Sequence, residues 1–196
     1  MIKLISCKAA CLLCKDEDCK DNYELYEYAV YIILSSAFHI ITVIALGLCF
    51  NLLVESLIFY FTFIAIRKFA GGYHAKTPTR CYLFSVISSI LMLCIIKSVN
   101  SVSSKFTYLL IIFELLCVVM IISISPLDTE NNPLSIREKK LYKLIASFIS
   151  IFIFIISVIC VFLGYRNIGL SIICGVIMST LVLLMRKIQI IYKLKM

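Results

Sequence analysis

Charged residues are scarce in this chain. Asp, Glu, Lys and Arg make up only 15% of its 196 residues, whereas hydrophobic residues make up 62% and the mean hydropathy is +1.06. A water-soluble domain normally has about a quarter of its residues charged. The shortage of charge excludes an ordinary soluble domain and indicates one polytopic domain embedded in a membrane.

Proline is also rare, and none of the three prolines interrupts an apolar run. Because proline breaks helices, its restriction to Pro78, Pro126 and Pro133 marks these positions as loops. We predict an all-α polytopic integral membrane protein with an amphipathic N-terminal segment. Its six transmembrane helices are expected near residues 28–48, 52–66, 82–96, 108–125, 144–164 and 168–185. The second and third runs are short, so we expect them to extend into the polar loop between them or to lean on neighbouring helices.

The first residues lack the pattern of a secretory signal, because Lys8 interrupts their apolar stretch too early. Residues 1–27 mix apolar, acidic and basic side chains and predict a helix lying at the membrane interface. The predicted organisation is therefore an interfacial cytosolic segment (1–27), a six-helix membrane domain (28–186) and a basic cytosolic tail (187–196).

Ten cysteines would suggest a disulfide framework in a small secreted domain. Here five of them lie within or at the ends of apolar runs, where cysteine behaves as a small hydrophobe; they are Cys49, Cys94, Cys117, Cys160 and Cys174. The N-terminal Cys7, Cys11, Cys14 and Cys19 could hold a metal, but their spacing matches no standard zinc pattern. We interpret them as a packed or membrane-facing stripe and expect no metal and no cofactor.

Basic residues are distributed unevenly between the predicted loops. If the N-terminus is internal, sixteen of the 19 Lys and Arg residues fall on the inner side, four in each of 1–27, 67–81, 126–143 and the tail after Met185. By the positive-inside rule, both termini are cytosolic in a multi-pass protein of the cell membrane. The net charge of +8 is then topological and should meet anionic lipid headgroups. No nucleic-acid-binding module is recognisable, so we expect no nucleic-acid partner.

The loop from Arg67 to Cys81 concentrates reactive residues between two apolar runs. It contains His74, one of only two histidines, and Cys81 follows seven residues later. On one continuous helix these two would be about 10.5 Å apart, too far for a hydrogen bond, so the chain must turn between them. Thr77 and Pro78 provide the turn, because Thr is a good N-cap and Pro is favoured at the first helical position.

This assignment places Cys81 in the opening turn of the third span. There the helix dipole and unpaired backbone N–H groups favour a thiolate, and Arg67 and Arg80 add positive potential. Gly71 and Gly72 allow close approach of a substrate chain, or they simply end the second span as a helix cap. The alternative that His74 and Cys81 have no catalytic role remains open on the residues alone.

The run Arg67-Lys-Phe-Ala-Gly-Gly-Tyr-His-Ala followed by Cys81 resembles the signature of the accessory gene regulator B (AgrB) family. A second stretch, residues 125–141, resembles the family's approach to its fifth segment, with acidic, Asn-Pro and basic elements. The resemblance covers roughly residues 24–190.

The resemblance implies a bacterial membrane cysteine endopeptidase that removes the C-terminal tail of an AgrD-like quorum-sensing propeptide. An acyl-enzyme would then be displaced by a Cys or Ser of the precursor, closing a thiolactone or lactone. Carried over by position, His74 is the general base and Cys81 the nucleophile, while Arg67, Gly71, Gly72 and Arg80 bind substrate or shape the site. Monomeric and homodimeric forms both remain open.

Three ionisable residues lie inside apolar runs: His39, Glu55 and Glu114. We predict that they form polar pairs between helices, with a proton path or substrate groove as the alternative. If they lined a path, the chain would be a peptide transporter or exporter without proteolytic activity. A third alternative is a metal-binding sensor or scaffold built on the N-terminal cysteines.

Overall fold

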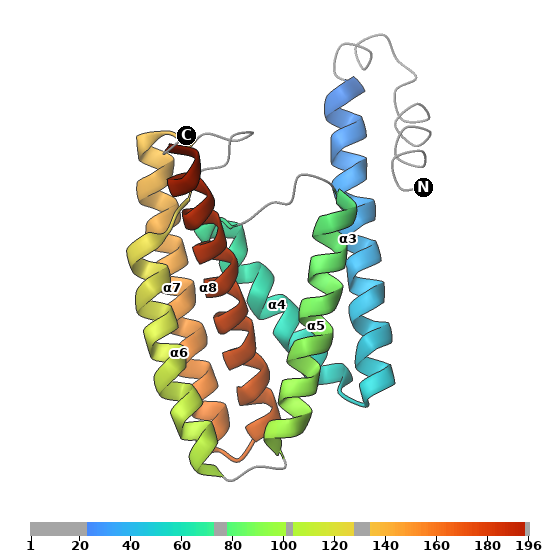
Figure 1. The fold of residues 1–196 in the computed structure, drawn as a ribbon, viewed down its shortest axis with the longest axis vertical. Helices are drawn as coiled ribbons and strands as arrows, with labels where there is room; N and C mark the ends of the chain where they lie inside the picture. The colour runs from blue at the N-terminus through green and yellow to red at the C-terminus, as the bar shows by residue number, and fades with distance from the viewer. Residues whose placement is uncertain (1–22, 73–77, 101–103, 128–133, 195–196) are drawn as a thin grey trace. The chain divides into compact units, whose positions relative to one another are not determined.

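A computed structural model describes residues 23–72, 78–100, 104–127 and 134–194 of the chain. In this part the protein is entirely helical, with six helices numbered α3 to α8 (Figure 1). They are α3 (Tyr23–Phe50), α4 (Leu53–Ala70), α5 (Pro78–Asn100), α6 (Ser104–Ile124), α7 (Ile136–Phe162) and α8 (Arg166–Leu194). The predicted all-α class is confirmed for these residues, and each of the six predicted runs coincides with one helix.

The observed helices are longer than the apolar runs that predicted them. The second run continues to Ala70, and the third begins at Pro78, so both extend into the polar loop as expected. The last helix continues past the predicted end at residue 185 and reaches Leu194. Apolar runs therefore located the helices but underestimated their polar ends.

Five of the described helices, α3, α5, α6, α7 and α8, contain segments long and apolar enough to cross a membrane. The exception, α4, carries Glu55, Arg67 and Lys68 within only 18 residues. The protein is thus a multi-pass membrane protein by its apolar helices.

The chain divides after Ala45 into two compact units. In the first unit the described residues form most of α3, whose exposed Ile33 and Ile41 give it an apolar surface suited to lipid. The second unit contains the end of α3 and all of α4 to α8.

Helix α8 is the centre of the second unit. It contacts α4, α5, α6 and α7 (Figure 1), and 72% of its apolar span is buried, against 17% for α7. Small residues make this possible, because they allow helix backbones to approach closely. A Cβ atom on Gly175 would lie only 2.7 Å from Thr62 Cγ2 of α4.

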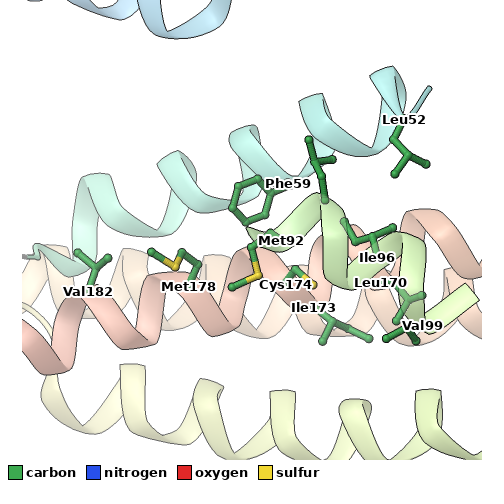
Figure 2. Packing of buried hydrophobic residues seen from close by; sticks show 11 residues of the cluster. Leu52, Phe59, Met92, Ile96, Val99, Leu170, Ile173, Cys174, Met178 and Val182 are labelled. Carbon is green, nitrogen blue, oxygen red and sulfur yellow. The ribbon is translucent and has the colours of Figure 1, made fainter. Parts of the chain in front are cut away.

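Two apolar clusters pack on α4 and α8. The first joins α4, α5 and α8 through residues such as Phe59, Met92 and Ile173 (Figure 2). The second joins α4, α6, α7 and α8, with Ile66 and Val176 fully buried. The large apolar side chains on the outer faces of α6 and α7 stay exposed, as expected for surfaces in contact with lipid.

Polar side chains tie the helices together inside the second unit. The Ser157 hydroxyl of α7 donates a 2.6 Å hydrogen bond to Oε2 of Glu114 in α6, and Asn167 of α8 donates to Glu55 of α4 at 3.2 Å. The predicted interhelical pairing is therefore confirmed for both glutamates. His39 lies half-buried within α3 of the first unit.

Ser157→Ala should destabilise the protein, because it leaves the fully buried Glu114 without its hydroxyl donor. We expect a loss of about 1 kcal/mol in the free energy of unfolding, in the range of interhelical hydrogen bonds in membranes. Thermal unfolding in detergent micelles measures the loss. Ser147→Ala is the matched control on the same helix, because the Ser147 hydroxyl donates to Lys143 of its own helix. Equal melting temperatures for the two variants would contradict this role of Ser157.

Candidate active site

The candidate site begins where α4 ends. Gly71 takes a positive φ of 80°, a conformation that residues with a side chain rarely adopt, and its N–H donates to the Arg67 carbonyl at 3.1 Å. The predicted helix-cap role of Gly71 is confirmed. Helix α4 therefore ends at Ala70, four residues before His74 in the sequence.

A segment from elsewhere in the sequence lies directly against this turn. The N–H of Leu127, which follows α6, donates to the Ala70 carbonyl at 3.1 Å. A Cβ atom on Gly71 would lie 2.6 Å from the Leu127 carbonyl oxygen, closer than real Cβ contacts come. Gly71 is therefore required twice, by its backbone angle and by the approach of the Leu127 backbone.

Helix α8 lies against the next residue. Gly72 is buried, and a Cβ atom there would lie 2.9 Å from Val182 Cγ1 and 3.8 Å from Nε of Arg67. Val182 is only 1% exposed, so its side chain has little room to move away. The backbone at Gly72 thus lies in a narrow space between Arg67 of α4 and Val182 of α8, which leaves no room for a side chain.

Arg67 has its guanidinium at this turn. Its Cζ lies 5.5 Å from the centre of the Phe63 ring, one turn earlier on α4, in a cation–π arrangement. The side chain is half-buried, and its Cγ and Nε border Gly72. A guanidinium held here can donate several hydrogen bonds to a carbonyl or carboxylate.

The other end of the loop is the start of α5. The helix begins at Pro78, and Cys81 lies in its opening turn, as predicted from the Thr-Pro pair. The backbone N–H groups of a first helical turn lack partners within the helix and favour negative charge nearby. Arg80 lies in the same turn. His74 and Thr77 lie outside the described residues.

The structure brings part of the predicted set together. Arg67, Gly71 and Gly72 are joined at one end of the second unit by Leu127 and Val182. The basic start of α7 lies at the same end, because Tyr142 packs edge-on against Phe69 of α4 with ring centroids 5.9 Å apart. Ser135 begins that helix with a capping box to Glu138.

Two contacts at this end were not anticipated from the sequence, those of Leu127 and Val182. Leu127 lies in the second stretch that carried the family resemblance, so its neighbourhood had a signal. Val182 is one apolar residue within a long apolar run, and no local pattern distinguishes it from its neighbours. The relevant signal was the glycine pair, which implies that something approaches closely.

The cysteines of the apolar runs have the placement expected of small hydrophobes. Cys117 and Cys174 are buried in the two apolar clusters, while Cys49 and Cys94 are exposed on helix surfaces. Within the described ranges, no three His, Cys, Asp or Glu side chains are grouped to hold a metal ion. The N-terminal Cys7, Cys11, Cys14 and Cys19 lie outside those ranges.

The chain is similar to known proteins over most of its length. The family model described as "Accessory gene regulator B" matches residues 6–183. The chain belongs to the accessory gene regulator B family. An AgrB-like protein of Clostridium perfringens strain SM101 is 32% identical over 90% of this chain and 83% of its own length.

Other relatives match a shorter part of the chain. The accessory gene regulator protein B of Staphylococcus intermedius is 26% identical over 66% of each chain. The protein FsrB of Enterococcus faecalis is 30% identical over 66% of this chain and 52% of its own length. No solved structure matches this chain.

Proposed function

We propose that this AgrB-family protein is a membrane cysteine endopeptidase that cleaves the C-terminal tail from a quorum-sensing propeptide. The observation that carries the proposal is the place of Cys81 in the opening turn of α5, the helix that follows the Gly71 cap of α4 in the sequence. The family membership supports it, because His74 and Cys81 belong to the motif that carried the resemblance. The substrate is an AgrD-like precursor peptide.

The first chemical step forms an acyl-enzyme. The Cys81 sulfur attacks the scissile carbonyl as His74 takes up the thiol proton, and the peptide bond breaks as His74 returns that proton to the leaving amine of the tail. The N–H groups at the start of α5 can stabilise the oxyanion that forms in between. Arg67 and Arg80 add positive potential and donors for substrate carbonyls or carboxylates.

The second step closes a ring. A Cys or Ser side chain of the precursor attacks the Cys81 thioester, its proton passes to His74, and the Cys81 sulfur leaves and is reprotonated. When the attacking group is a thiol, one thioester replaces another, so the activation of the carbonyl is conserved. The product is a thiolactone or lactone peptide.

The proposed topology has six membrane crossings, with both termini and the active site on the cytosolic side. Its support is the positive-inside pattern, since the ends of α4 and α8 and the start of α7 all carry Lys and Arg. In this topology α4 also crosses the membrane, in addition to the five more apolar helices, and it packs along the buried α8. A cytosolic site keeps Cys81 reduced and available. The chain could work as a homodimer or alone, and the mechanism needs only one copy.

Cys81→Ala and His74→Ala should each abolish tail removal, because one removes the nucleophile and the other its base. In cells that coexpress the precursor, we expect cleavage to fall by about a thousandfold or more, as for paired catalytic residues elsewhere. Immunoblots of the precursor measure cleavage, and membrane fractions check insertion. Cys94→Ala is the matched control, since Cys94 lies exposed on the same helix. Continued cleavage by either inserted variant would refute the assigned roles.

The orientation can be tested across α7 alone. In a background with the native cysteines replaced by serine, Ile136→Cys and Tyr165→Cys place single thiols at exposed positions before and after this apolar helix. A membrane-impermeant maleimide applied to intact cells should label position 165, whereas position 136 should react only after permeabilisation. Labelling of position 136 from outside would reverse the proposed topology.

A further inference from the structure

We propose that Val182 of α8 and Leu127 after α6 are positioning residues of the peptidase, which fix the point and direction in which the chain leaves α4 toward His74. The inference rests on the proposed function, because it assigns these residues to that same site. Neither side chain bears a group that could take part in the chemistry, so both would act only through the glycine pair.

Leu127 fixes the point of departure through its backbone. Its N–H holds the last carbonyl of α4, and its own carbonyl occupies the space that a Cβ of Gly71 would need. The Leu127 side chain packs on the cluster formed by α4, α6, α7 and α8. The peptide that meets Gly71 is therefore anchored in the core of the second unit and cannot yield easily.

Val182 fixes the direction that follows. Its γ-methyl would be 2.9 Å from a Cβ on Gly72, and the Val182 side chain is itself buried in the cluster that joins α4, α5 and α8 (Figure 2). Protein interiors are packed densely enough that such a methyl transmits a displacement to its neighbours. Any side chain at position 72 must therefore push the chain away from α8, two residues before His74.

The two glycine contacts differ in a way that a mutation series can detect. The obstacle at Gly71 is backbone, joined to a positive φ, so no side-chain change elsewhere can relieve it. The obstacle at Gly72 is a side-chain methyl, so shortening Val182 can relieve it. If Val182 positions the chain at Gly72, the loss of activity in Gly72→Ala should be rescued by Val182→Ala. The loss in Gly71→Ala should not be rescued by this change.

The start of α8, away from Val182, provides a matched control: a glycine that is closely packed but lies outside the proposed site. A Cβ on Gly169 would lie 2.5 Å from Val161 Cγ2, again a glycine against a valine methyl. Gly169 lies in the first turn of α8, whose other half carries Val182, and it is buried as Gly72 is. Gly169→Ala should thus cost stability of the folded protein without changing the turnover of the molecules that do fold.

The experiment measures kcat and KM for precursor cleavage by the purified full-length protein in detergent, together with thermal unfolding. We expect Gly72→Ala to lower kcat at least tenfold with KM changed less than about twofold, since a displaced base slows chemistry more than binding. Gly72→Ala with Val182→Ala should regain most of that loss. Gly169→Ala should lower the melting temperature and leave kcat per folded molecule unchanged. A folded double variant no faster than Gly72→Ala would overturn the proposal.

A second variant keeps the test decisive if Gly72→Ala fails to insert. Val182→Leu enlarges the opposing side chain while Gly72 stays in place, and it should give the same selective loss of kcat. Unchanged kcat in folded Val182→Leu and Gly72→Ala would sink the inference even if cleavage depends on Cys81. Cleavage that survives Cys81→Ala would instead refute the proposed function, so the two failures can be told apart.

Discussion

The close packing of α4 on α8 is the contact on which the second unit depends. It requires glycine at position 175, where any side chain would meet Thr62 of α4. In lipid, apolar side chains gain little from meeting one another rather than lipid tails, so tight backbone approach and polar ties must hold helices together. Both apolar clusters include residues of α4 and α8. Next to them, Gly71 packs against the segment after α6 and Gly72 packs against α8.

Much of this fold could be predicted from the sequence because the membrane imposes strict rules. Scarce charge and uninterrupted apolar runs located the six helices of the described residues, and the Thr-Pro pair located the start of α5 at Pro78. Helix ends were less predictable, since polar residues such as Arg67 and Lys68 continue α4 beyond its apolar run. The cost of an isolated charge in lipid predicted that Glu55 and Glu114 would each have a polar partner on another helix. It could not predict that these partners are Asn167 and Ser157, respectively.

The sequence points to the polar residues of the candidate site but not to the apolar residues that pack around it. His74 and Cys81 stand out because reactive side chains are rare in such a chain, and the family membership supports the motif that contains them. Val182 and Leu127 do not stand out, because their importance comes from where they lie relative to two glycines far away in sequence. A single sequence shows that a glycine pair leaves room, but only the packed helices show which atoms fill that room.

Arg166 changes how the charge asymmetry of the chain is understood. It is one of three basic residues in the predicted external loops, yet its guanidinium donates to Thr107 at 2.8 Å and to the Val99 carbonyl at 3.0 Å. Through these hydrogen bonds Arg166 links α8 to α5 and α6 at the end of the unit away from Gly71. Because its guanidinium is committed to helix packing, this residue explains why a cation lies in a loop where the positive-inside pattern predicts few of them.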